Sequence, residues 1–395
     1  MALFLSLLFL LSTLSHAHTS SLTLPITKDH ATQQYLTTLS YGTPGEDARF
    51  VLDLGGSLFW VDCSSRTTPS SSLNPIFLRS IRCLTAKTPQ IDTQTWLYNL
   101  GSPEQEQPCQ VPAENAVTGK RVAAEGDLVE DLVHVHGHPS HTLLLTCAPT
   151  PLLNGLASSA KGVLGLGRSR TSFSSQLFHS LGTQRKITFC LSPSSGVLQF
   201  GKFAHDSLRS LTFTPLVATH DQTYPSINVN SVKINGKRVS FSGGVAQLST
   251  VVPYTALQTS IYENFLSAYL KAALAVNMSR VAPVAPFGLC FGSGGGVGPS
   301  VPVIDLVLQS EMVKWSVYAR NSMVRVNDDV VCLGFVDGGE NPMNPIVIGG
   351  YQLEDVLVQF DFDTSMVGFS TSLFTRQATC SDFKSATATQ SVSPW

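Results

Sequence analysis

Two halves of the chain repeat one order of features: a hydrophobic strand ending in a tight turn, a long excursion, and an apolar pair followed by glycine. In the first half the turn lies at Asp53 in VLDLGG, and the closing glycine, Gly165, follows 112 positions later. In the second half Ser249 in QLST and Gly349 in VIGG are 100 positions apart. A repeat of this length is too long for a solenoid and indicates two copies of a whole lobe.

The composition favours short strands within each lobe. Of the 395 residues, 43% are hydrophobic, enough for a sizeable core, while the 13% that are charged are only about half the usual share. Turn residues separate short alternating runs at residues 34–63 and 226–239, whereas residues 64–120 look loop-dominated. Residues 259–274 have helical spacing. Length and pattern together predict a mostly β protein of two domains or one bilobal unit.

Residues 1–19 are predicted to be a secretory signal peptide. An apolar run at residues 2–11 is followed by Ser-His-Ala at residues 15–17, a small-x-small pattern that suits signal peptidase. The run is too short to span a membrane, and a buried core helix is the other alternative. A formal net charge of -2 provides no basic field for nucleic acid. We therefore expect a soluble, exported protein whose partners are neither membranes nor nucleic acids.

The cysteine count supports export. Eight cysteines follow the signal, an even number that predicts a disulfide framework in a secreted chain, and no CxxC spacing suggests zinc. The residues alone leave the pairing open. One sequon, Asn277-Met278-Ser279, predicts glycosylation of Asn277. The cysteines are Cys63, Cys83, Cys109, Cys147, Cys190, Cys290, Cys332 and Cys380.

Three segments resemble the pepsin-like aspartic proteases. YGTPGEDARFVLDLGGSLFWV at residues 41–61 is similar to the first catalytic hairpin, GVLGLGR at 162–168 to the turn that crosses behind it, and residues 347–369 to the closing segment of the second lobe. The resemblance covers nearly the whole chain after the signal. It implies an all-β, bilobal pepsin-like fold with two β-barrel-like lobes around a central cleft. The N-terminal lobe is placed at residues 20–203 and the C-terminal lobe at 204–395.

The first turn departs from the protease pattern. Such enzymes need one Asp-Thr/Ser-Gly turn from each lobe, because two carboxylates about 3 Å apart share a proton and act as base and acid. Asp53 and Gly55 fit this pattern. Leu54, however, stands where the family has a hydroxyl, and Gly56 replaces a serine or threonine. We expect Asp53 to be a relic with a structural role, although its presence leaves a feeble acid protease open as an alternative.

The second turn departs further. Ser249 stands at the aspartate position, Thr250 at the hydroxyl position and Val251 at the glycine position. A serine cannot share an acidic proton. The rival carboxylate, Asp337, lies only twelve positions before Gly349, so it is expected in a surface turn. The resemblance therefore implies that no catalytic site is functional.

The DLGG and LST variants, with NDDVVCLGFVDGG and IVIGGYQLEDVLVQFD, resemble the plant branch of inactive members. This branch comprises inhibitors of microbial xylanases and xyloglucan endoglucanases, extracellular dermal glycoproteins, basic 7S globulins and gamma conglutins. The resemblance implies a secreted, apoplastic inhibitor of microbial cell-wall-degrading glycoside hydrolases in plant defence, without a cofactor. A storage or peptide-binding globulin is a further alternative. The resemblance and the lobe boundaries also imply the disulfides Cys63–Cys147, Cys83–Cys109, Cys190–Cys380 and Cys290–Cys332.

An inhibitor of such hydrolases must block a cleft that contains two carboxylates, for which a long cation on an exposed loop is suited. In the resembling inhibitors this role belongs to loops of the C-terminal lobe. Arg376 in SLFTRQATC is the candidate, with a solvated loop arginine as the plainer alternative. A second loop, residues 291–300, carries neither arginine nor histidine.

Two further features have plain structural interpretations. Trp60 and Trp315 lie within apolar strands, so we expect them in the core and not as sugar-stacking platforms. Four histidines surround a Gly and Pro turn, and without a carboxylate or cysteine to complete a coordination set a solvated hairpin is favoured over a metal site. These are His134, His136, His138 and His141.

Overall fold

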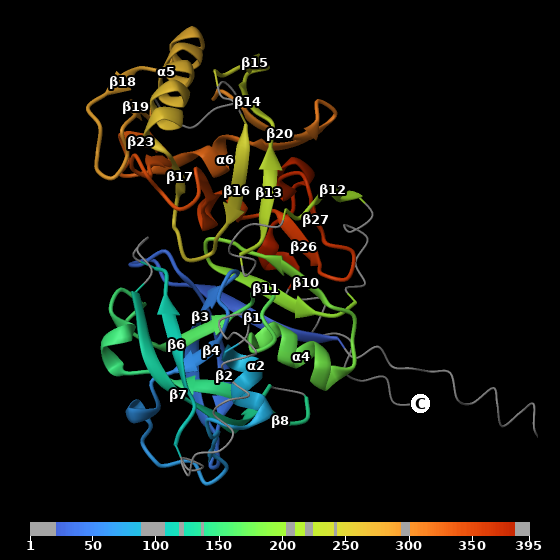
Figure 1. The fold of residues 1–395 in the computed structure, drawn as a ribbon. Coiled ribbons are helices and arrows are strands. Elements are labelled where there is room, and N and C mark those ends of the chain that lie inside the picture. The colour runs from blue at the N-terminus through green and yellow to red at the C-terminus, as the bar shows by residue number, and fades with distance from the viewer. Residues whose placement is uncertain are drawn as a thin grey trace, which may run out of the picture.

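The computed structural model describes residues 21–87, 107–117, 122–135, 138–202, 210–217, 224–240, 243–293 and 301–383. The predicted signal peptide, His136 and residues 294–300 lie outside the described residues. Strands dominate the described chain, which confirms the mostly β, bilobal prediction (Figure 1). None of its helices is both long and apolar enough to cross a membrane.

The described part of the N-terminal half contains eleven strands and two α-helices. They are β1 (Leu22–Lys28), β2 (Tyr35–Tyr41), β3 (Glu46–Asp53), β4 (Phe59–Val61), β5 (Asn74–Pro75), α2 (Ile81–Lys87), β6 (Gln110–Asn115), β7 (Val122–His134), β8 (His141–Cys147), β9 (Ala160–Gly165), α4 (Phe173–Leu181), β10 (Lys186–Cys190) and β11 (Ser195–Phe200) among the described residues. Short 3-10 turns lie at Cys63–Ser65 and Thr150–Leu153.

The C-terminal half has shorter strands and the long helix α5. Its elements among the described residues are β12 (Thr212–Pro215), β13 (Ser226–Val229), β14 (Ser231–Ile234), β15 (Lys237–Arg238), β16 (Gly244–Leu248), β17 (Thr255–Leu257), α5 (Thr259–Ala275), β18 (Arg280–Val281), β19 (Cys290–Gly292), β20 (Ile304–Ser310), β21 (Val313–Val317), α6 (Ala319–Ser322), β22 (Met323–Arg325), β23 (Val330–Leu333), β24 (Phe335–Asp337), β25 (Ile346–Ile348), β26 (Leu357–Asp361) and β27 (Met366–Phe369). Three 3-10 turns follow β25 or β27: η5 (Gly350–Leu353), η6 (Leu373–Arg376) and η7 (Cys380–Asp382).

The two halves repeat one strand topology. In the first half the strand order is β2-β3-β9-β4-β8, and in the second it is β13-β16-β25-β17-β24. In both, the first pair is antiparallel, the second parallel, the third antiparallel and the fourth parallel. The repeat seen in the sequence is therefore a repeat of five paired strands, and it places the turns after β3 and β16 at equivalent positions.

A shared sheet joins the halves. Its order runs β12-β27-β26-β10-β11-β1, so three strands from each half lie side by side between the two halves (Figure 1). Strands β10 and β26 pair antiparallel from Lys186↔Asp361 to Cys190↔Leu357. The proposed lobe boundary at residues 203/204 falls at the start of a segment, residues 203–209, outside the described chain.

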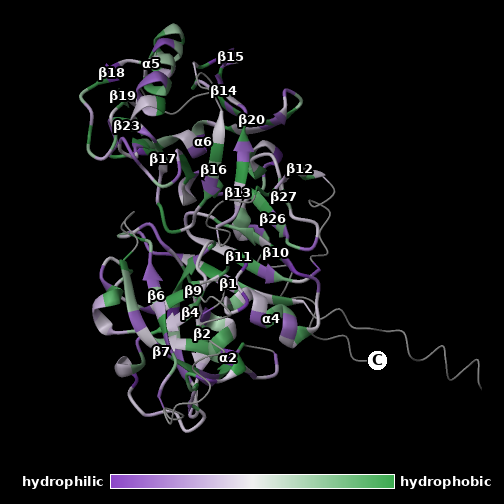
Figure 2. Cartoon of the chain, viewed as in Figure 1, coloured by the Kyte–Doolittle hydropathy of each residue, from purple (hydrophilic) through white to green (hydrophobic). Residues whose placement is uncertain are grey.

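Burial alternates along β1 and β6, whereas β10, β11 and β26 are buried almost throughout. Figure 2 shows hydrophobic residues on the strands of both halves. In the first half, edge-to-face contacts link Phe50, Phe59, Phe173 and Phe200 in a row. Trp60 and Trp315 are buried, as predicted. A chain of aromatic edges and faces is a favourable way to fill a sheet interior, and Phe50 connects it to β3, the strand that ends at Asp53.

Candidate functional site

The first turn follows β3 and is built around Asp53. The carboxylate Oδ1 accepts the Gly55 N–H at 2.9 Å. The Asp53 carbonyl accepts the N–H groups of Gly56 at 3.2 Å and of Leu166, beside the crossing turn, at 2.8 Å. Only 3% of Asp53 is exposed. Asp53 thus stabilises its own turn and its junction with β9.

The second turn follows β16 and has a serine at the equivalent place. The N–H of Ser249 donates to the Ile348 carbonyl at 3.0 Å. Its Oγ accepts the N–H groups of Val251 at 3.3 Å and Val252 at 3.2 Å. Ser249 is 1% exposed. This hydroxyl therefore stabilises its own turn, and it provides no second carboxyl to share a proton with Asp53.

Thr250 links the two turns directly. Its Oγ1 donates to the Leu52 carbonyl at 2.6 Å and accepts the Leu54 N–H at 3.3 Å. Leu54 has no hydroxyl with which to reciprocate. The cross-link between the turns therefore runs in one direction, from the second half to the backbone on both sides of Asp53.

Apolar side chains occupy the remaining positions of the two turns. Leu54 is buried and belongs to the main hydrophobic core. Val251, at the glycine position, is buried in a cluster with Leu36, Val51 and Trp60 of the first half. The two turns are thus held together by packing as well as by the Thr250 hydrogen bonds.

Two tyrosines that sequence reasoning did not assign pack across the halves. A Cβ added to Gly55 would lie 1.7 Å from the buried Tyr224 ring, so this ring lies directly against the first turn. A Cβ added to Gly350 would lie 2.5 Å from the Tyr35 ring. Tyr35 and Tyr224 precede or begin the equivalent strands β2 and β13. The sequence signal for them is their repeated position at or just before an alternating run.

A buried ion pair accompanies Tyr35 between the halves. Lys28 Nζ lies 2.7 Å from Glu354 Oε1, and both side chains are largely buried. The Tyr35 hydroxyl donates to the same oxygen at 2.8 Å. Burial, followed by the charge of Glu354, raises the pKa of Tyr35, which keeps the hydroxyl protonated as a donor.

Asp337 was predicted in a surface turn, but it is the last residue of β24, where it pairs with Leu257 of β17. Asp337 is exposed, and its Oδ1 accepts from the Thr259 hydroxyl and the Gly339 N–H. Among the described histidines, His134 ends β7 and His141 begins β8. His134 pairs with the Ser140 hydroxyl. Burial and nearby His138 lower the pKa of His141. Within the described residues no group of three potential metal ligands is present.

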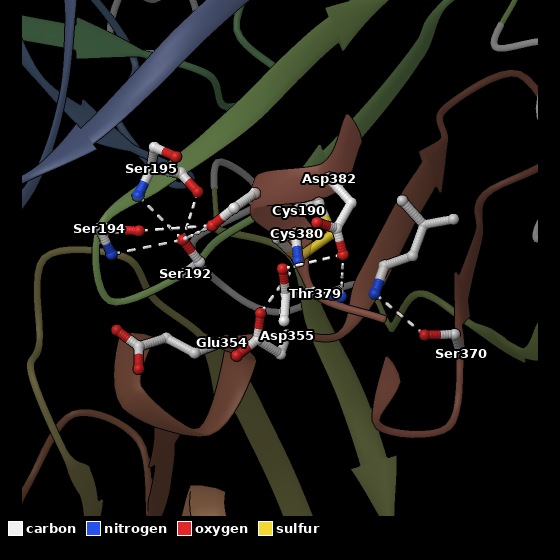
Figure 3. Close-up of a disulfide and its surroundings, with 12 residues drawn as sticks. Cys190, Ser192, Ser194, Ser195, Glu354, Asp355, Ser370, Thr379, Cys380 and Asp382 are labelled. Carbon is white, nitrogen blue, oxygen red and sulfur yellow. Dashed lines mark hydrogen bonds between the residues drawn. A yellow bond between two sulfur atoms is a disulfide. The ribbon is translucent and has the colours of Figure 1, made fainter. Parts of the chain in front are cut away.

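Arg376 is the last residue of the turn η6, which follows β27. Arg376 is exposed, and none of the described hydrogen bonds or ion pairs includes its side chain. The turn ends at Gln377, whose backbone is left-handed with φ of 57°. The Cys190–Cys380 disulfide ties the segment that follows to the end of β10 (Figure 3).

Four disulfides are present, and no described cysteine is free. Their pairing coincides with the one that the resemblance implies: Cys63–Cys147, Cys83–Cys109, Cys190–Cys380 and Cys290–Cys332. Three of these bonds each join two cysteines of the same half, two in the N-terminal half and one in the C-terminal half. Only Cys190–Cys380 connects the N-terminal half to the C-terminal segment.

Fold and turns together define a class: a pepsin-like protein with an incomplete pair of catalytic turns. A crystal structure of an aspartic proteinase from Irpex lacteus covers 90% of this chain and 98% of its own, with a TM-score of 0.62 at 14% identity. That likeness shows the pepsin-like fold. The structure titled "Crystal structure of edgp" is nearer, with a TM-score of 0.82 and 39% identity over 92% of this chain and 98% of the other.

Two family models match this chain, one in each half. The model described as "Xylanase inhibitor N-terminal" matches residues 35–202, and "Xylanase inhibitor C-terminal" matches residues 224–371. The chain belongs to this family of pepsin-fold proteins. Similar relatives include "Probable aspartic proteinase GIP2" of Nicotiana benthamiana, 40% identical over 96% of each chain. "Gamma conglutin 1" of Prunus dulcis is 33% identical over 99% of this chain and 97% of its own.

Proposed function

We propose that this protein is secreted, does not cleave peptides, and binds and inhibits microbial cell-wall-degrading glycoside hydrolases of the xylanase or xyloglucan endoglucanase type in the plant apoplast. One observation carries the proposal: Ser249 occupies the second catalytic position, and its Oγ accepts hydrogen bonds from its own turn. The family models described as xylanase inhibitors, which match both halves, support the same function. A pepsin fold with this turn is suited to binding and not to peptide hydrolysis.

Peptide hydrolysis by this fold requires both carboxyls. One carboxylate takes a proton from water while the other protonates the peptide carbonyl. Loss of one acid or base typically removes about 10²- to 10⁴-fold of rate. The Tyr224 ring against Gly55 further favours a structural role for the first turn, because that ring restricts the space beside Asp53.

A long cation is suited to block a hydrolase cleft, because the cleft contains two catalytic carboxylates. Arg376 suits this role, since it is exposed on a short turn whose two flanks are anchored by buried Leu373 and Cys380. A fixed loop loses little conformational entropy on binding. Within the proposed interface, Arg376 would pair with a catalytic carboxylate in a site from which water is excluded.

Proteolysis tests the first part of the proposal. Purified protein should not cleave denatured globin between about pH 2 and 6, the range in which paired carboxyls work. Pepstatin and Asp53→Ala serve as controls. Cleavage that pepstatin blocks and Asp53→Ala abolishes would establish the alternative, a residual aspartic endopeptidase.

Inhibition tests the second part. Secreted fungal xylanases and xyloglucan endoglucanases should include at least one that the wild type inhibits, and Arg376→Ala should weaken that inhibition about 30- to 5,000-fold. Inhibition of none of them would leave the storage or peptide-binding globulin, an alternative supported by the similarity to a protein named "Basic 7S globulin". Unchanged inhibition by Arg376→Ala would remove Arg376 from the site and leave the function in place.

The proposed export of the protein is supported by its disulfides and by the exposed Asn277, and it can be tested separately. The four disulfides favour an oxidising compartment. Asn277 is exposed after α5 in a left-handed backbone conformation with φ of 62°, which leaves it accessible for glycosylation. Protein collected from the medium of plant cells should begin near residue 20, and a deglycosylating enzyme should reduce its mass unless Asn277→Gln is present. An intact N-terminus on intracellular protein would contradict export.

A further inference from the structure

An exposed arginine stacks on an exposed aromatic ring next to the loop of Arg376. The guanidinium carbon of Arg320, in α6, lies 3.6 Å from the centroid of the Phe374 ring in η6. The Arg320 side chain is 49% exposed and Phe374 is 36% exposed. A cation over a ring face is favourable, so the stack holds the guanidinium in one plane at the surface.

Asp355 fixes both members of this stack. Its Oδ2 accepts the Arg320 Nε–H at 3.3 Å, and its carbonyl accepts the Leu373 N–H, at the start of η6, at 2.8 Å. Its Oδ1 accepts the Cys380 N–H at 3.0 Å, beside the disulfide in Figure 3. Asp355 is 1% exposed. One buried carboxylate therefore positions Arg320 and the turn that carries both Phe374 and Arg376.

The Arg320 guanidinium retains donors for a partner. Asp355 takes only the Nε–H, and within the described chain no hydrogen bond is recorded from Nη1 or Nη2. These nitrogens form a planar fork that matches a carboxylate bidentately. About half of the Arg320 side chain faces solvent, so a partner can reach it.

We propose that Arg320, Phe374 and Arg376 form one contact surface, and that Arg320 is a second, pre-positioned arginine of the inhibitory site. Its partner is a carboxylate in the substrate cleft of a glycoside hydrolase, a cleft that contains two carboxylates. The inference rests on the proposed function. Two cations on one anchored surface complement two acids, and arginines and aromatic residues are the side chains that most often dominate binding energy.

The two arginines differ in how they are prepared for binding. Arg376 has no described partner, so it must be ordered when the complex forms. Arg320 is already held by Asp355 and Phe374. Removal of the Arg320 fork should therefore accelerate dissociation, because a pre-positioned contact contributes mainly to the lifetime of the complex.

The test measures association and dissociation rates against a hydrolase that the wild type inhibits. Arg320→Ala should weaken binding about tenfold or more, mainly in the dissociation rate. Arg320→Lys should restore little, since an ammonium lacks the fork. Phe374→Ala should weaken binding because it removes the ring that holds Arg320. Phe374→Trp keeps an aromatic ring there and should bind about as well as the wild type. Arg280→Ala, an exposed arginine in β18, removes the same charge and should change binding less than about twofold.

Each outcome decides one question. If the wild type inhibits no hydrolase, the proposed function and this inference fail together. If it inhibits and Arg376→Ala weakens binding while Arg320→Ala does not, the function stands and the second arginine is overturned. If Arg320→Ala fails to fold, Phe374→Ala, which leaves the Asp355 pair in place, decides: unchanged binding overturns the proposal. Equal losses in the single variants and in Arg320→Ala/Phe374→Ala would support one coupled contact.

Discussion

The turn at Asp53 and the turn at Ser249 occupy equivalent positions, yet each contains a different part of what a catalytic pair requires. The first has the carboxylate but an apolar residue, Leu54, at the hydroxyl position. The second has the hydroxyl of Thr250 but no carboxylate. Because Thr250 contacts the backbone of both Leu52 and Leu54, the cross-link persists without the acid pair. In this fold, the contacts that join the turns are separable from the groups that perform hydrolysis.

The largest expected effect comes from restoring the missing acid. Ser249→Asp places a carboxyl in a position that is 1% exposed and next to Thr250, which contacts the residues flanking Asp53. Burial and the neighbouring carboxyl would raise the pKa of the new group, and its charged form should destabilise the fold by about 3–5 kcal/mol at pH 7. The raised pKa makes the loss smaller at acidic pH.

Urea unfolding of Ser249→Asp at neutral and acidic pH measures this difference. Ser249→Asn, of similar size but without a charge, should show a smaller loss that does not depend on pH. If Ser249→Asp is as stable as the wild type at neutral pH and cleaves peptides in a pepstatin-sensitive way, the missing carboxyl alone accounts for the lack of proteolysis.

The next largest effect tests the packing between the halves. Gly55→Ala would bring a methyl group against the buried Tyr224 ring, and such overpacking typically costs about 1–3 kcal/mol. Tyr224→Ala should relieve the clash, so the double variant should be less destabilised than the sum of the singles. Thermal unfolding of the four proteins gives the coupling, and strict additivity would contradict the contact.

A smaller effect is expected from the one-way cross-link. Thr250→Val removes the hydroxyl and leaves the Leu52 carbonyl and the Leu54 N–H without that partner, at a cost of about 1–2 kcal/mol. Thr85→Val removes an exposed hydroxyl in α2 and serves as the matched control. Equal stability of the two variants in urea would mean that packing of Leu54 and Val251 alone holds the turns together.

The smallest effect concerns the shared sheet. Burial acts to raise the pKa of Asp361, but hydrogen bonds from Lys186 and Thr364 outweigh it, so the pKa lies below its ordinary value. A lowered pKa stabilises the fold above the unfolded value near 4 and ceases to do so as the pH falls through the folded value. Asp361→Asn should therefore cost about 0.3–1 kcal/mol near pH 6.

The cost of Asp361→Asn should shrink as the pH falls through the lowered pKa of Asp361 in the folded protein, because the wild-type carboxyl then becomes neutral as well. Chemical unfolding across this range measures it, with exposed Asp328→Asn as the charge-matched control. A cost that remains constant with pH would assign the role of Asp361 to its hydrogen-bond geometry and not to its charge.

Local pattern predicted much of the fold. Helix α5 spans Thr259–Ala275, against residues 259–274 expected from its spacing, because its buried residues recur every three or four positions. The repeated strands were predictable for the same reason. The stretch 64–120 was expected to be loop-dominated, but β6 at Gln110–Asn115 pairs along β7. That strand depends on a partner distant in the sequence, which its own polar composition does not reveal.

The site was predictable only in part. Ser249 and Thr250 could be placed by resemblance, since they occupy a motif with fixed spacing. The contacts of Tyr224 with Gly55 and of Arg320 with Phe374 join residues far apart in the chain. No period or motif relates such residues, and only the folded arrangement brings them together.

The Cys190–Cys380 bond also determines how the molecule carries mechanical load. The residues between these cysteines, 190 positions apart, form a closed covalent loop that contains most of the C-terminal half. Tension applied to the chain outside the loop passes through the sulfur atoms and bypasses everything inside. A single cut by a foreign protease within the loop would likewise release no fragment, so that half can be nicked and still remain attached.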